Sequence, residues 1–505
     1  MKPRLRALLL DGASLALGAA LVTAFAPFGL WPLGFGIPIL FLLVLDATPR
    51  PGRAFVRGGL FGLGLFGWGV SWIYVSLHTV GGIPTLGTLV LLGLLDVYCA
   101  LFYALVAALS VRFSPPASAR RALLVFPALW TLAEILRGRL LTGFPWLDLG
   151  ASQIHGVFAG AVPLVGVVGT GFLVLVTGGL WLESFRASRP RQLGLLALVL
   201  ALLAGTTLLA RVSWTRPAGP PVTVALVQAD VPQAMKWRPG MARHELALYR
   251  RMSAPLWSRA QLVVWPESAI TTWYRDVRRP LARLARKLRR RHVRLLTGIL
   301  LDRAGGLYNG AVELGGRRPL FYEKHHLVPF GDYVPLPRWA RAWLRAWRLP
   351  HSGFDAGPRR PPFMRVRGVP FAVSICYEDA FGRDIRRALP RAAFLVNISD
   401  DAWFGRTIGP FQHYELAEAR ALETGRWLVR ADNSAVSGIV TPDGRSLVRL
   451  APFVRADLTA RVVPYRGETP YDRSGEMPTE VAALLALLFA GALGRRRRPA
   501  PAPAR

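Results

Sequence analysis

Seven long apolar stretches occupy the first 210 residues, and they limit the possible fold more than any other feature. A helix needs about 20 mostly apolar residues to cross a bilayer. The stretches centre on residues 7–24, 30–45, 55–77, 84–108, 122–136, 158–182 and 193–210, and another follows at 480–493. The sequence therefore predicts a seven-span membrane domain over 1–210 and a C-terminal span over 480–494.

The first stretch also has the form of a signal peptide. Basic residues precede the apolar run, and Ala24-Phe25-Ala26 imitates a cleavage site. Pro27 would follow the cut, which disfavours cleavage, and further apolar stretches come directly after it. We expect this segment to be retained as a span.

Basic residues concentrate on alternate loops between the apolar stretches. One side collects Lys2, Arg4, Arg6, Arg50, Arg53, Arg57, Arg112, Arg120, Arg121, Arg186, Arg189, Arg191 and Arg495 to Arg498. The opposite short loops contain only Arg137 and Arg139. Since cytoplasmic loops are enriched in Lys and Arg, both termini are predicted to be cytoplasmic, including a basic tail over 495–505. The region 211–479 then lies on the far side, which is the periplasm in a bacterium with two membranes.

The composition excludes several other classes. The net charge is +33, but no nucleic-acid reader motif accompanies it, so we expect no nucleic-acid partner. Two cysteines, Cys99 and Cys376, make no disulfide framework. The segment Gly62–Gly67 matches the dinucleotide fingerprint G-x-G-x-x-G, but it lies in an apolar span, where small residues favour close helix packing instead.

The region 211–479 alternates strand-like and helix-like patterns. Runs rich in β-branched residues occur at 222–227, 262–265, 295–300, 371–375, 394–398 and 427–429. Helical periodicity occurs around 240–257, 278–291 and 412–426. This alternation predicts a layered α/β domain inserted before the last span.

Three segments in this region place reactive side chains at strand ends or in a loop. Cys376 ends an apolar strand, and thiolate chemistry needs a base beside such a thiol, although a buried structural cysteine fits the stretch equally well. Glu267 follows Trp265-Pro266, where it is either a general base or an acid near a helix N-terminus. Lys324 is either an oxyanion-stabilising cation or a solvated surface residue, and the adjacent histidines lack metal-binding spacing.

Together these segments resemble the nitrilase superfamily, and their surroundings resemble the apolipoprotein N-acyltransferase family. The resemblance rests on Val224–Gln228, Pro232-Gln233, Met235-Lys236-Trp237, Trp265-Pro266-Glu267, Lys324-x-His326-Leu-Val-Pro-Phe-Gly331, Cys376-Tyr377-Glu378, Asn397-Ile-Ser399, Asp401-Ala-Trp403-Phe404-Gly405, Arg420-Ala421 and Thr142-Gly-Phe-Pro-Trp146. It covers nearly the whole chain, including spans on both sides of the nitrilase-like domain.

The resemblance implies an αββα sandwich over 211–479 and a two-step acyl transfer without cofactor or metal. It assigns Glu267, Lys324 and Cys376 as the catalytic triad, with Asp332 and Glu378 as supporting residues. Trp237 and Tyr377 are expected to contact substrate. The implied partners are a phospholipid acyl donor and a diacylglyceryl apolipoprotein acceptor, handled by a multi-pass monomer in the bacterial inner membrane.

The chain departs from the family pattern at three places, none of them in the triad. Asp332 stands where glutamate is usual, Asp400-Asp401 replaces Asn-Asp, and Asn433-Ser434-Ala435 lacks a glycine after Asn433. Two other functions stay open at this point. A membrane-anchored nitrilase-type amidase would share the triad. A transporter or scaffold would use only the spans; transporters usually carry charged residues there, and Asp96 and Glu134 are the obvious acids within the spans of this chain.

Overall fold

The chain divides into two compact units. The computed structural model describes residues 3–333, 353–360 and 362–496. Within them, the first unit consists of the segments up to Ser71, from Leu92 to Val212 and from Ser474 onward, and the second consists of Trp72–Leu91 and Ser213–Arg473. The boundaries at Val212 and Ser474 lie close to the predicted ones, whereas the grouping of Trp72–Leu91 with the second unit was not predicted. Most of the predicted basic tail, from residue 497 on, lies outside the described residues.

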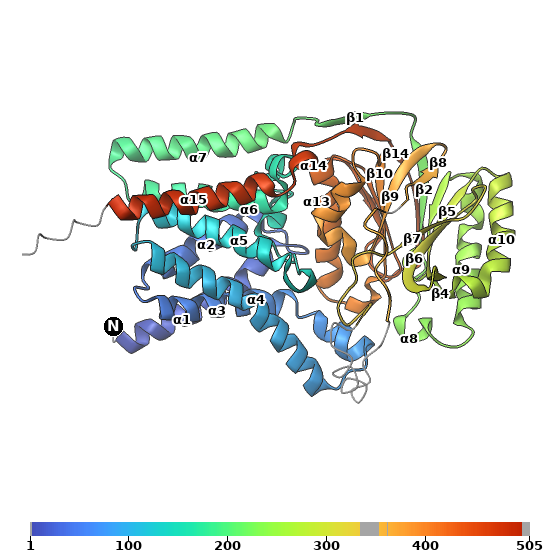
Figure 1. The fold of residues 1–505 in the computed structure, drawn as a ribbon, viewed down its shortest axis with the longest axis horizontal. Coiled ribbons are helices and arrows are strands. Elements are labelled where there is room, and N and C mark those ends of the chain that lie inside the picture. Colours follow the sequence, from blue (N-terminus) through green and yellow to red (C-terminus); the bar gives the residue numbers. More distant parts are fainter. Residues whose placement is uncertain (1–2, 334–352, 361, 497–505) are drawn as a thin grey trace, which may run out of the picture. The chain divides into compact units, whose positions relative to one another are not determined.

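The helices of the first unit follow the predicted apolar stretches. They are α1 (Pro3–Leu21), α2 (Trp31–Asp46), α3 (Pro51–Gly69), α4 (Thr85–Phe113), α5 (Phe126–Arg137), α6 (Val162–Ser184), α7 (Arg189–Leu209) and α15 (Met477–Arg496) (Figure 1). Among the described helices, those at Arg4–Ala24, Thr85–Phe113, Ala159–Ser184 and Arg189–Leu209 are long and apolar enough to cross a membrane, and α2 and α15 are apolar but shorter. Helix α3 ends at Gly69, earlier than expected, and a π-helical turn follows at Val75–Val80.

Glycines let the helices of the first unit pack closely. Gly62 of α3 lies against Ala100 of α4, where a Cβ would come within 2.5 Å of the Ala100 Cα atom. Gly64 lies directly against the backbone of Leu15 in α1, and Gly18 of α1 lies against the backbone of Phe61. Gly62 and Gly64 of the glycine pattern at 62–67 therefore serve close helix contact, as predicted.

Two buried charged residues of the first unit, Glu134 and Arg137, form hydrogen bonds within the protein. The carboxylate of Glu134 accepts hydrogen bonds from the Trp130 indole and the Leu149 backbone, both at 2.9 Å. Arg137 donates to Asp148 at 2.6 Å and to the carbonyl oxygens of Phe144 and Trp146. Glu134 and Arg137 therefore fix the loop that follows α5, which gives these charges a structural role.

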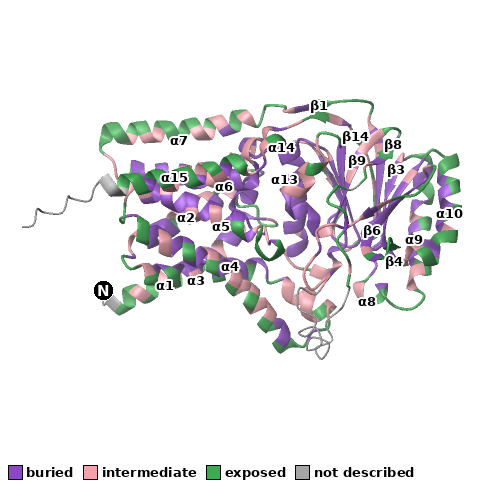
Figure 2. Ribbon diagram, viewed as in Figure 1, coloured by how far each residue is buried: buried purple, intermediate pink, exposed green. Residues whose placement is uncertain are grey.

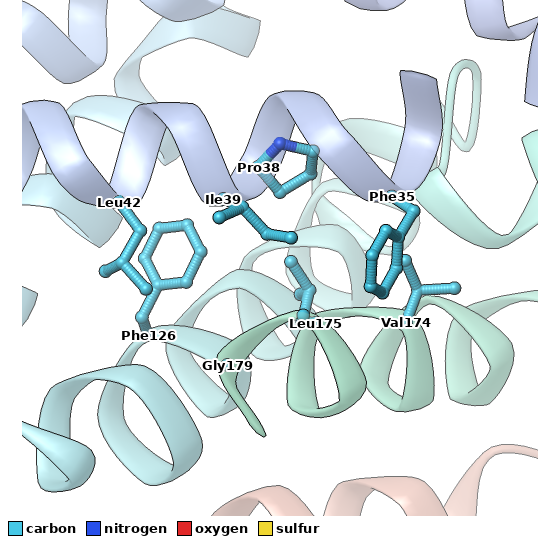
Figure 3. Close-up of a pocket in the computed structure, with 9 residues that line it drawn as sticks. Phe35, Pro38, Ile39, Leu42, Phe126, Val174, Leu175 and Gly179 are labelled. Carbon is cyan, nitrogen blue, oxygen red and sulfur yellow. The ribbon is translucent and has the colours of Figure 1, made fainter. Parts of the chain in front are cut away.

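An apolar cleft lies between α2, α5 and α6 (Figure 3). The cleft is small, and it is lined by Phe35, Pro38, Ile39, Leu42, Phe126, Val174 and Leu175. Gly178 widens the cleft, because a Cβ there would lie 3.0 Å from the Ile39 side chain. The lining offers no hydrogen-bonding side chain, so it suits hydrocarbon better than water.

The second unit contains two large sheets and a small one. The first large sheet has the order β14-β2-β3-β5-β6-β7, with β4 paired to β5. Its strands are β2 (Val222–Gln228), β3 (Leu262–Val264), β4 (Ile270–Trp273), β5 (Arg294–Arg303), β6 (Gly306–Leu314), β7 (Leu320–Glu323) and β14 (Ala456–Val462). Strands β2, β3 and β5 run parallel, and β14, β6 and β7 pair antiparallel to their neighbours.

The second large sheet has the order β13-β12-β11-β10-β9-β8. Its strands are β8 (Met364–Val366), β9 (Val369–Ile375), β10 (Phe394–Ser399), β11 (Leu428–Asp432), β12 (Gly438–Val440) and β13 (Ser446–Arg449). Strands β9, β10 and β11 are parallel, with Ile375 opposite Ile398 and Ser399 opposite Asp432. A two-stranded sheet joins β1 (Thr215–Pro217) to β15 (Tyr465–Gly467).

The two large sheets pack face to face, and helices cover their outer faces. One core joins the sheets through side chains such as Leu226, Val264, Phe371 and Val396. Helices α9 (Met241–Ser253) and α10 (Tyr274–Arg290) cover the first sheet, and α13 (Gly409–Thr424) covers the second (Figure 1). The inner strands β2, β3, β10 and β11 are buried almost throughout, whereas strands such as β13 and β14 are only partly buried (Figure 2). This αββα sandwich confirms the predicted fold class.

Short helices complete the second unit at the strand ends. They are α8 (Gln233–Lys236), α12 (Gly382–Ile385) and α14 (Pro470–Ser474). Strands β3, β7, β9, β10 and β11 all run toward the same end of the sandwich, and polar residues follow each of them. Side chains at the carboxyl ends of such strands meet at one edge, which is where α/β proteins commonly form their sites.

Candidate active site

The edge of the sandwich brings Glu267, Lys324 and Cys376 together. Lys324 directly follows β7 and Cys376 directly follows β9, while Glu267 lies three residues beyond the end of β3. The chain continues sheet-like pairing to Glu267, because the Gly298 backbone amide donates to the Pro266 carbonyl oxygen at 3.1 Å. Gly298 makes this approach possible, since a Cβ there would lie 2.6 Å from the Glu267 Cα atom.

Lys324 is buried between two carboxylates. Its Nζ atom lies 2.8 Å from Asp332 Oδ2 and 3.5 Å from Glu267 Oε1. The Val328 backbone amide also donates to Asp332 Oδ2, at 2.9 Å, so the loop after Lys324 folds back onto this carboxylate. The shorter aspartate side chain therefore reaches the lysine directly; its supporting role stays a prediction.

Asn309 joins the two carboxylates, and sequence reasoning missed it. Its Nδ2 atom donates to Glu267 Oε1 at 2.7 Å and to Asp332 Oδ1 at 3.2 Å. Its backbone carbonyl oxygen accepts from the Lys324 amide at 2.9 Å. Asn309 lies inside β6 and is 5% exposed, so a buried amide in an otherwise apolar strand was the available signal.

Burial and mutual charge set the protonation of this group. Burial raises the pKa of Glu267, the Asp332 charge raises it further, and the Lys324 cation and the Asn309 hydrogen bond oppose the rise. Burial acts against the charge of Lys324, but Asp332 and Glu267 outweigh it and hold its pKa well above the usual range. The site thus combines a carboxylate poised to take a proton with a permanent cation.

Cys376 occupies a strained turn at the end of β9. Its φ angle is 53°, a left-handed conformation that side chains other than glycine rarely adopt. Burial and the neighbouring Glu267 charge raise the pKa of the thiol well above its usual range, although Lys324 opposes the rise. The thiol is therefore protonated at neutral pH and needs a base, and the groups whose charges act on it include Glu267.

Glu378 connects the segments that carry Lys324 and Cys376. Its Oε1 atom accepts from the backbone amides of His325 and His326, at 2.8 and 3.1 Å. Its Oε2 atom accepts from the Ile375 amide and the Tyr322 hydroxyl, both at 2.7 Å. One buried carboxylate thus holds residues that flank both catalytic candidates, and its predicted role in orienting Lys324 or Glu267 stays a prediction.

A buried ion-pair network lies beside Cys376, and it was not predicted. Arg430 of β11 donates to Asp379 at 2.7 Å and to Asp401 at 2.8 Å. His413 of α13 lies between the same two carboxylates, at 3.0 and 2.8 Å. Although burial and Arg430 oppose its charge, these carboxylates raise the pKa of His413 to about 9. An arginine in a buried strand was the sequence signal for this network.

The network also contains three potential metal-ligating atoms. Within the described part of the chain, Cys376, Asp401 and His413 place such atoms within 4.8 Å of one another. Both His413 nitrogens already face carboxylates, and an Arg430 nitrogen lies 2.8 Å from His413 Nδ1. The guanidinium supplies the positive charge that a metal would bring, so these side chains fit an ion-pair network better than a metal centre.

Comparison with known proteins identifies the family. Residues 17–180 match the model of the apolipoprotein N-acyltransferase N-terminal domain, and residues 223–469 match that of carbon-nitrogen hydrolase. The apolipoprotein N-acyltransferase of Methylococcus capsulatus is 40% identical over 96% of this chain and 95% of its own length. That of Azotobacter vinelandii is 41% identical over 97% and 96%. This chain belongs to the apolipoprotein N-acyltransferase family. It is therefore an acyltransferase of the carbon-nitrogen hydrolase superfamily and a membrane protein of bacterial type.

The two predicted substrate contacts of this acyltransferase differ in exposure. Trp237 directly follows α8, and 52% of it is exposed. Tyr377 is 8% exposed, and its ring lies 5.0 Å from that of Phe381 and 5.9 Å from that of His326. Trp237 is thus available to a ligand, whereas Tyr377 packs mainly among aromatic side chains.

A segment between two helices of the acyltransferase packs on the catalytic domain. The Trp72 indole donates to Gln412 Oε1 at 3.2 Å, and its ring lies 4.2 Å from that of Phe404. The Ser76 hydroxyl donates to the Trp403 carbonyl oxygen at 2.9 Å. Gln412 precedes His413, so this segment supports the region that holds the ion-pair network. Because its apolar residues resemble a span in sequence, this contact could not be predicted.

Proposed function

We propose that this enzyme moves a fatty acyl chain from a phospholipid, through a thioester on Cys376, to an apolipoprotein. The acceptor is the α-amine of the N-terminal diacylglyceryl-cysteine. The observation that carries the proposal is the placement of a strained, protonated thiol under the charges of Glu267 and Lys324. Such a thiol, beside a base and a fixed cation, is suited to acyl transfer.

In the first half-reaction Glu267 takes the thiol proton, and the sulfur attacks the ester carbonyl carbon of the phospholipid. Lys324 stabilises the oxyanion of the tetrahedral intermediate, an effect typically worth about 3–4 kcal/mol. When the intermediate collapses, the carbon–oxygen bond breaks and protonated Glu267 returns the proton to the leaving oxygen. The products are a lysophospholipid and an acyl thioester on Cys376.

In the second half-reaction the neutral α-amine of the acceptor attacks the thioester carbonyl. Glu267 accepts the amine proton, and Lys324 again faces the oxyanion. The carbon–sulfur bond breaks, the thiolate takes the proton from Glu267, and the acceptor leaves as an amide. The scheme is ping-pong, with both substrates using one site in turn.

The membrane unit gives this chemistry its location. Eight spans, with both termini cytoplasmic, agree with the distribution of basic residues and place 211–479 on the periplasmic side of the inner membrane. Both substrates are lipids, so a thiol held at the membrane surface meets their acyl chains without moving them through water. One polypeptide carries the triad, so we propose that the monomer is active.

The test is an acyl-transfer assay with purified protein in phospholipid vesicles and a synthetic diacylglyceryl-cysteine peptide. We expect an N-acylated peptide with the wild-type enzyme and none with Cys376→Ser. Cys99→Ser is the matched control, because Cys99 is a buried thiol in α4 and should not affect transfer. Free fatty acid as the only product would instead support the membrane-anchored amidase. Full transfer by Cys376→Ser would contradict the thioester on Cys376, and no reaction with the wild-type protein would support a scaffold.

A further inference from the structure

A buried ion pair lies next to the proposed triad, outside the residues that the mechanism uses. Lys236, the last residue of α8, is 1% exposed, and Asp400, the first residue after β10, is 5% exposed. The Lys236 Nζ atom lies 2.5 Å from Asp400 Oδ2. The pair therefore joins two segments that are 164 residues apart in the chain.

Further hydrogen bonds extend this contact along the turn that contains Lys236. The other Asp400 oxygen accepts from Asn433 Nδ2 at 3.0 Å. The Asn433 side chain in turn binds both backbone groups of Val231, accepting from the amide at 3.2 Å and donating to the carbonyl oxygen at 2.9 Å. At the other end of the turn, the Thr271 hydroxyl donates to the Lys236 carbonyl oxygen at 2.6 Å. Hydrogen bonds thus hold the turn at Val231 and at the Lys236 carbonyl oxygen, and the ion pair holds the Lys236 side chain.

The ion pair connects a half-exposed aromatic residue to the nucleophile's surroundings. Trp237 directly follows Lys236. On the other side, Asp401 directly follows Asp400, and its charge acts on the Cys376 thiol. The Asp400 charge also acts on the Glu267 carboxyl and adds to the rise in its pKa. A shift of either partner would therefore reach both the predicted substrate contact and the triad.

The energetics argue for positioning rather than for stability. Two buried charges lose their hydration, and a well-packed apolar pair in their place is often as stable or more stable. A buried ion pair does, however, disfavour arrangements of its neighbours that would separate the two charges, because each charge would then lose its partner.

We propose that the Lys236–Asp400 ion pair is a positioning device that holds Trp237 in register with Cys376 and thereby sets the affinity for lipid substrate. The inference rests on the proposed acyl transfer. Lys236 and Asp400 are positioning residues, since they act through Trp237. Loss of the ion pair should therefore weaken substrate binding more than it slows the chemical step, so that KM rises while kcat changes little.

The test compares Lys236→Met, Trp237→Ala and the double variant Lys236→Met/Trp237→Ala in the transfer assay. We expect each single variant to raise the KM of the same substrate about tenfold or more, with kcat changed less than about threefold. The double variant should have the KM of Trp237→Ala alone, because both changes act through one side chain. Multiplying effects on KM, or unchanged KM in Lys236→Met, would overturn the proposal.

Two further variants keep the test independent of folding. Lys236→Met/Asp400→Asn removes both charges, so it should fold while its KM stays raised; restoration of the wild-type KM would show that the pair serves charge balance alone. Arg294→Met is the matched control, since it breaks the Arg294–Glu313 pair at 3.3 Å, at the amino end of β5. It should leave KM unchanged.

Hydrogen exchange in the detergent-solubilised full chain separates this proposal from the proposed function. We expect Lys236→Met to speed amide exchange over residues 231–240, and Arg294→Met to leave it unchanged there. If the wild-type enzyme transfers no acyl chain, the proposed function fails. Amide exchange over residues 231–240 then still tests whether the Lys236–Asp400 ion pair holds this turn. If the wild-type enzyme is active but exchange and KM are the same in Lys236→Met, the positioning proposal fails alone.

Discussion

Replacing Asp332 by asparagine removes one of the two carboxylates that hold Lys324. At an effective dielectric constant of about 20, the attraction of Lys324 to Asp332 at 2.8 Å is on the order of 6 kcal/mol, against about 5 kcal/mol to Glu267 at 3.5 Å. Breaking a buried ion pair typically costs about 3–5 kcal/mol. In the variant Glu267 is then the main ion-pair partner of Lys324, and this stronger pairing makes it a poorer base for the thiol.

The same change should move the pH range of activity downward. The Asp332 charge raises the pKa of Glu267, so its removal lowers that pKa, and Glu267 stays ionised to lower pH. The Asp332 charge also raises the pKa of Lys324, so the lysine should lose its proton at lower pH in the variant. Both limbs of the kcat/KM profile should therefore shift toward acid, by about one pH unit or more.

The assay is acyl transfer to the diacylglyceryl peptide between pH 5 and 10. We expect Asp332→Asn to lower kcat/KM about 10²–10³-fold, the range seen when a stabilising group at an oxyanion is lost. Asp332→Glu keeps the charge and serves as the control, with a smaller loss and no acid shift. Activity of Asp332→Asn within threefold of wild type, with the same pH limbs, would refute the assigned role of Asp332.

Three other perturbations test the remaining parts of the site. Asn309→Ala removes a hydrogen bond that lowers the pKa of Glu267, so the acid limb of kcat/KM should move to higher pH, opposite to Asp332→Asn, with about a tenfold loss in rate; an unshifted limb would contradict this. His413 has its pKa raised from 6.5 to about 9, so its contribution of about 3 kcal/mol is complete below pH 6.5 and is lost as pH rises through 9. Thermal unfolding should show the wild-type Tm falling between pH 6.5 and 9. His413→Gln should have a lower Tm at pH 7, and its Tm should change less with pH; the same change of Tm with pH in both proteins would contradict this role of His413. Trp72→Ala should destabilise the catalytic domain by about 3–5 kcal/mol, and Trp72→Phe, which keeps the ring but loses the bond to Gln412, by about 1 kcal/mol; denaturant unfolding that ranks them equally would contradict the contact.

The catalytic candidates were visible in the sequence because strand ends mark them. Cys376 follows an unbroken apolar strand, and Glu267 follows a proline that ends another. Residues at the carboxyl ends of strands in one sandwich can meet in space, but the resemblance to the nitrilase superfamily was needed to predict that these two residues and Lys324 act together. The apolar stretches likewise predicted where the helices of the first unit lie, although only four of the described helices are long and apolar enough to cross a membrane.

The supporting network depended on contacts that a single sequence does not carry. Arg430 and His413 approach Asp379 and Asp401 only after β11 and α13 have packed beside β9 and β10. In the sequence, Arg430 looks like a lone charged residue in an apolar run, and His413 looks like one polar residue among several in a helix. Asn309 is hidden for the same reason, since its two carboxylate partners lie 42 and 23 residues away.

The segment after α3 shows how composition misleads. Its residues are apolar enough to extend the predicted span 55–77, but the helix ends at Gly69. Gly67 and Gly69 have low helix propensity, and Trp72 instead packs on Phe404. An apolar segment can be buried by protein as well as by lipid, and only the tertiary contact decides which.

The central claim is that Cys376 carries the acyl chain. Its most direct test is the intact mass of the purified protein after incubation with phospholipid in the absence of acceptor. We expect a mass increase of one acyl group that hydroxylamine removes, present in Cys99→Ser and absent in Cys376→Ser. An adduct that persists in Cys376→Ser, or no adduct in a wild-type enzyme that still transfers acyl chains to the peptide, would contradict the thioester mechanism.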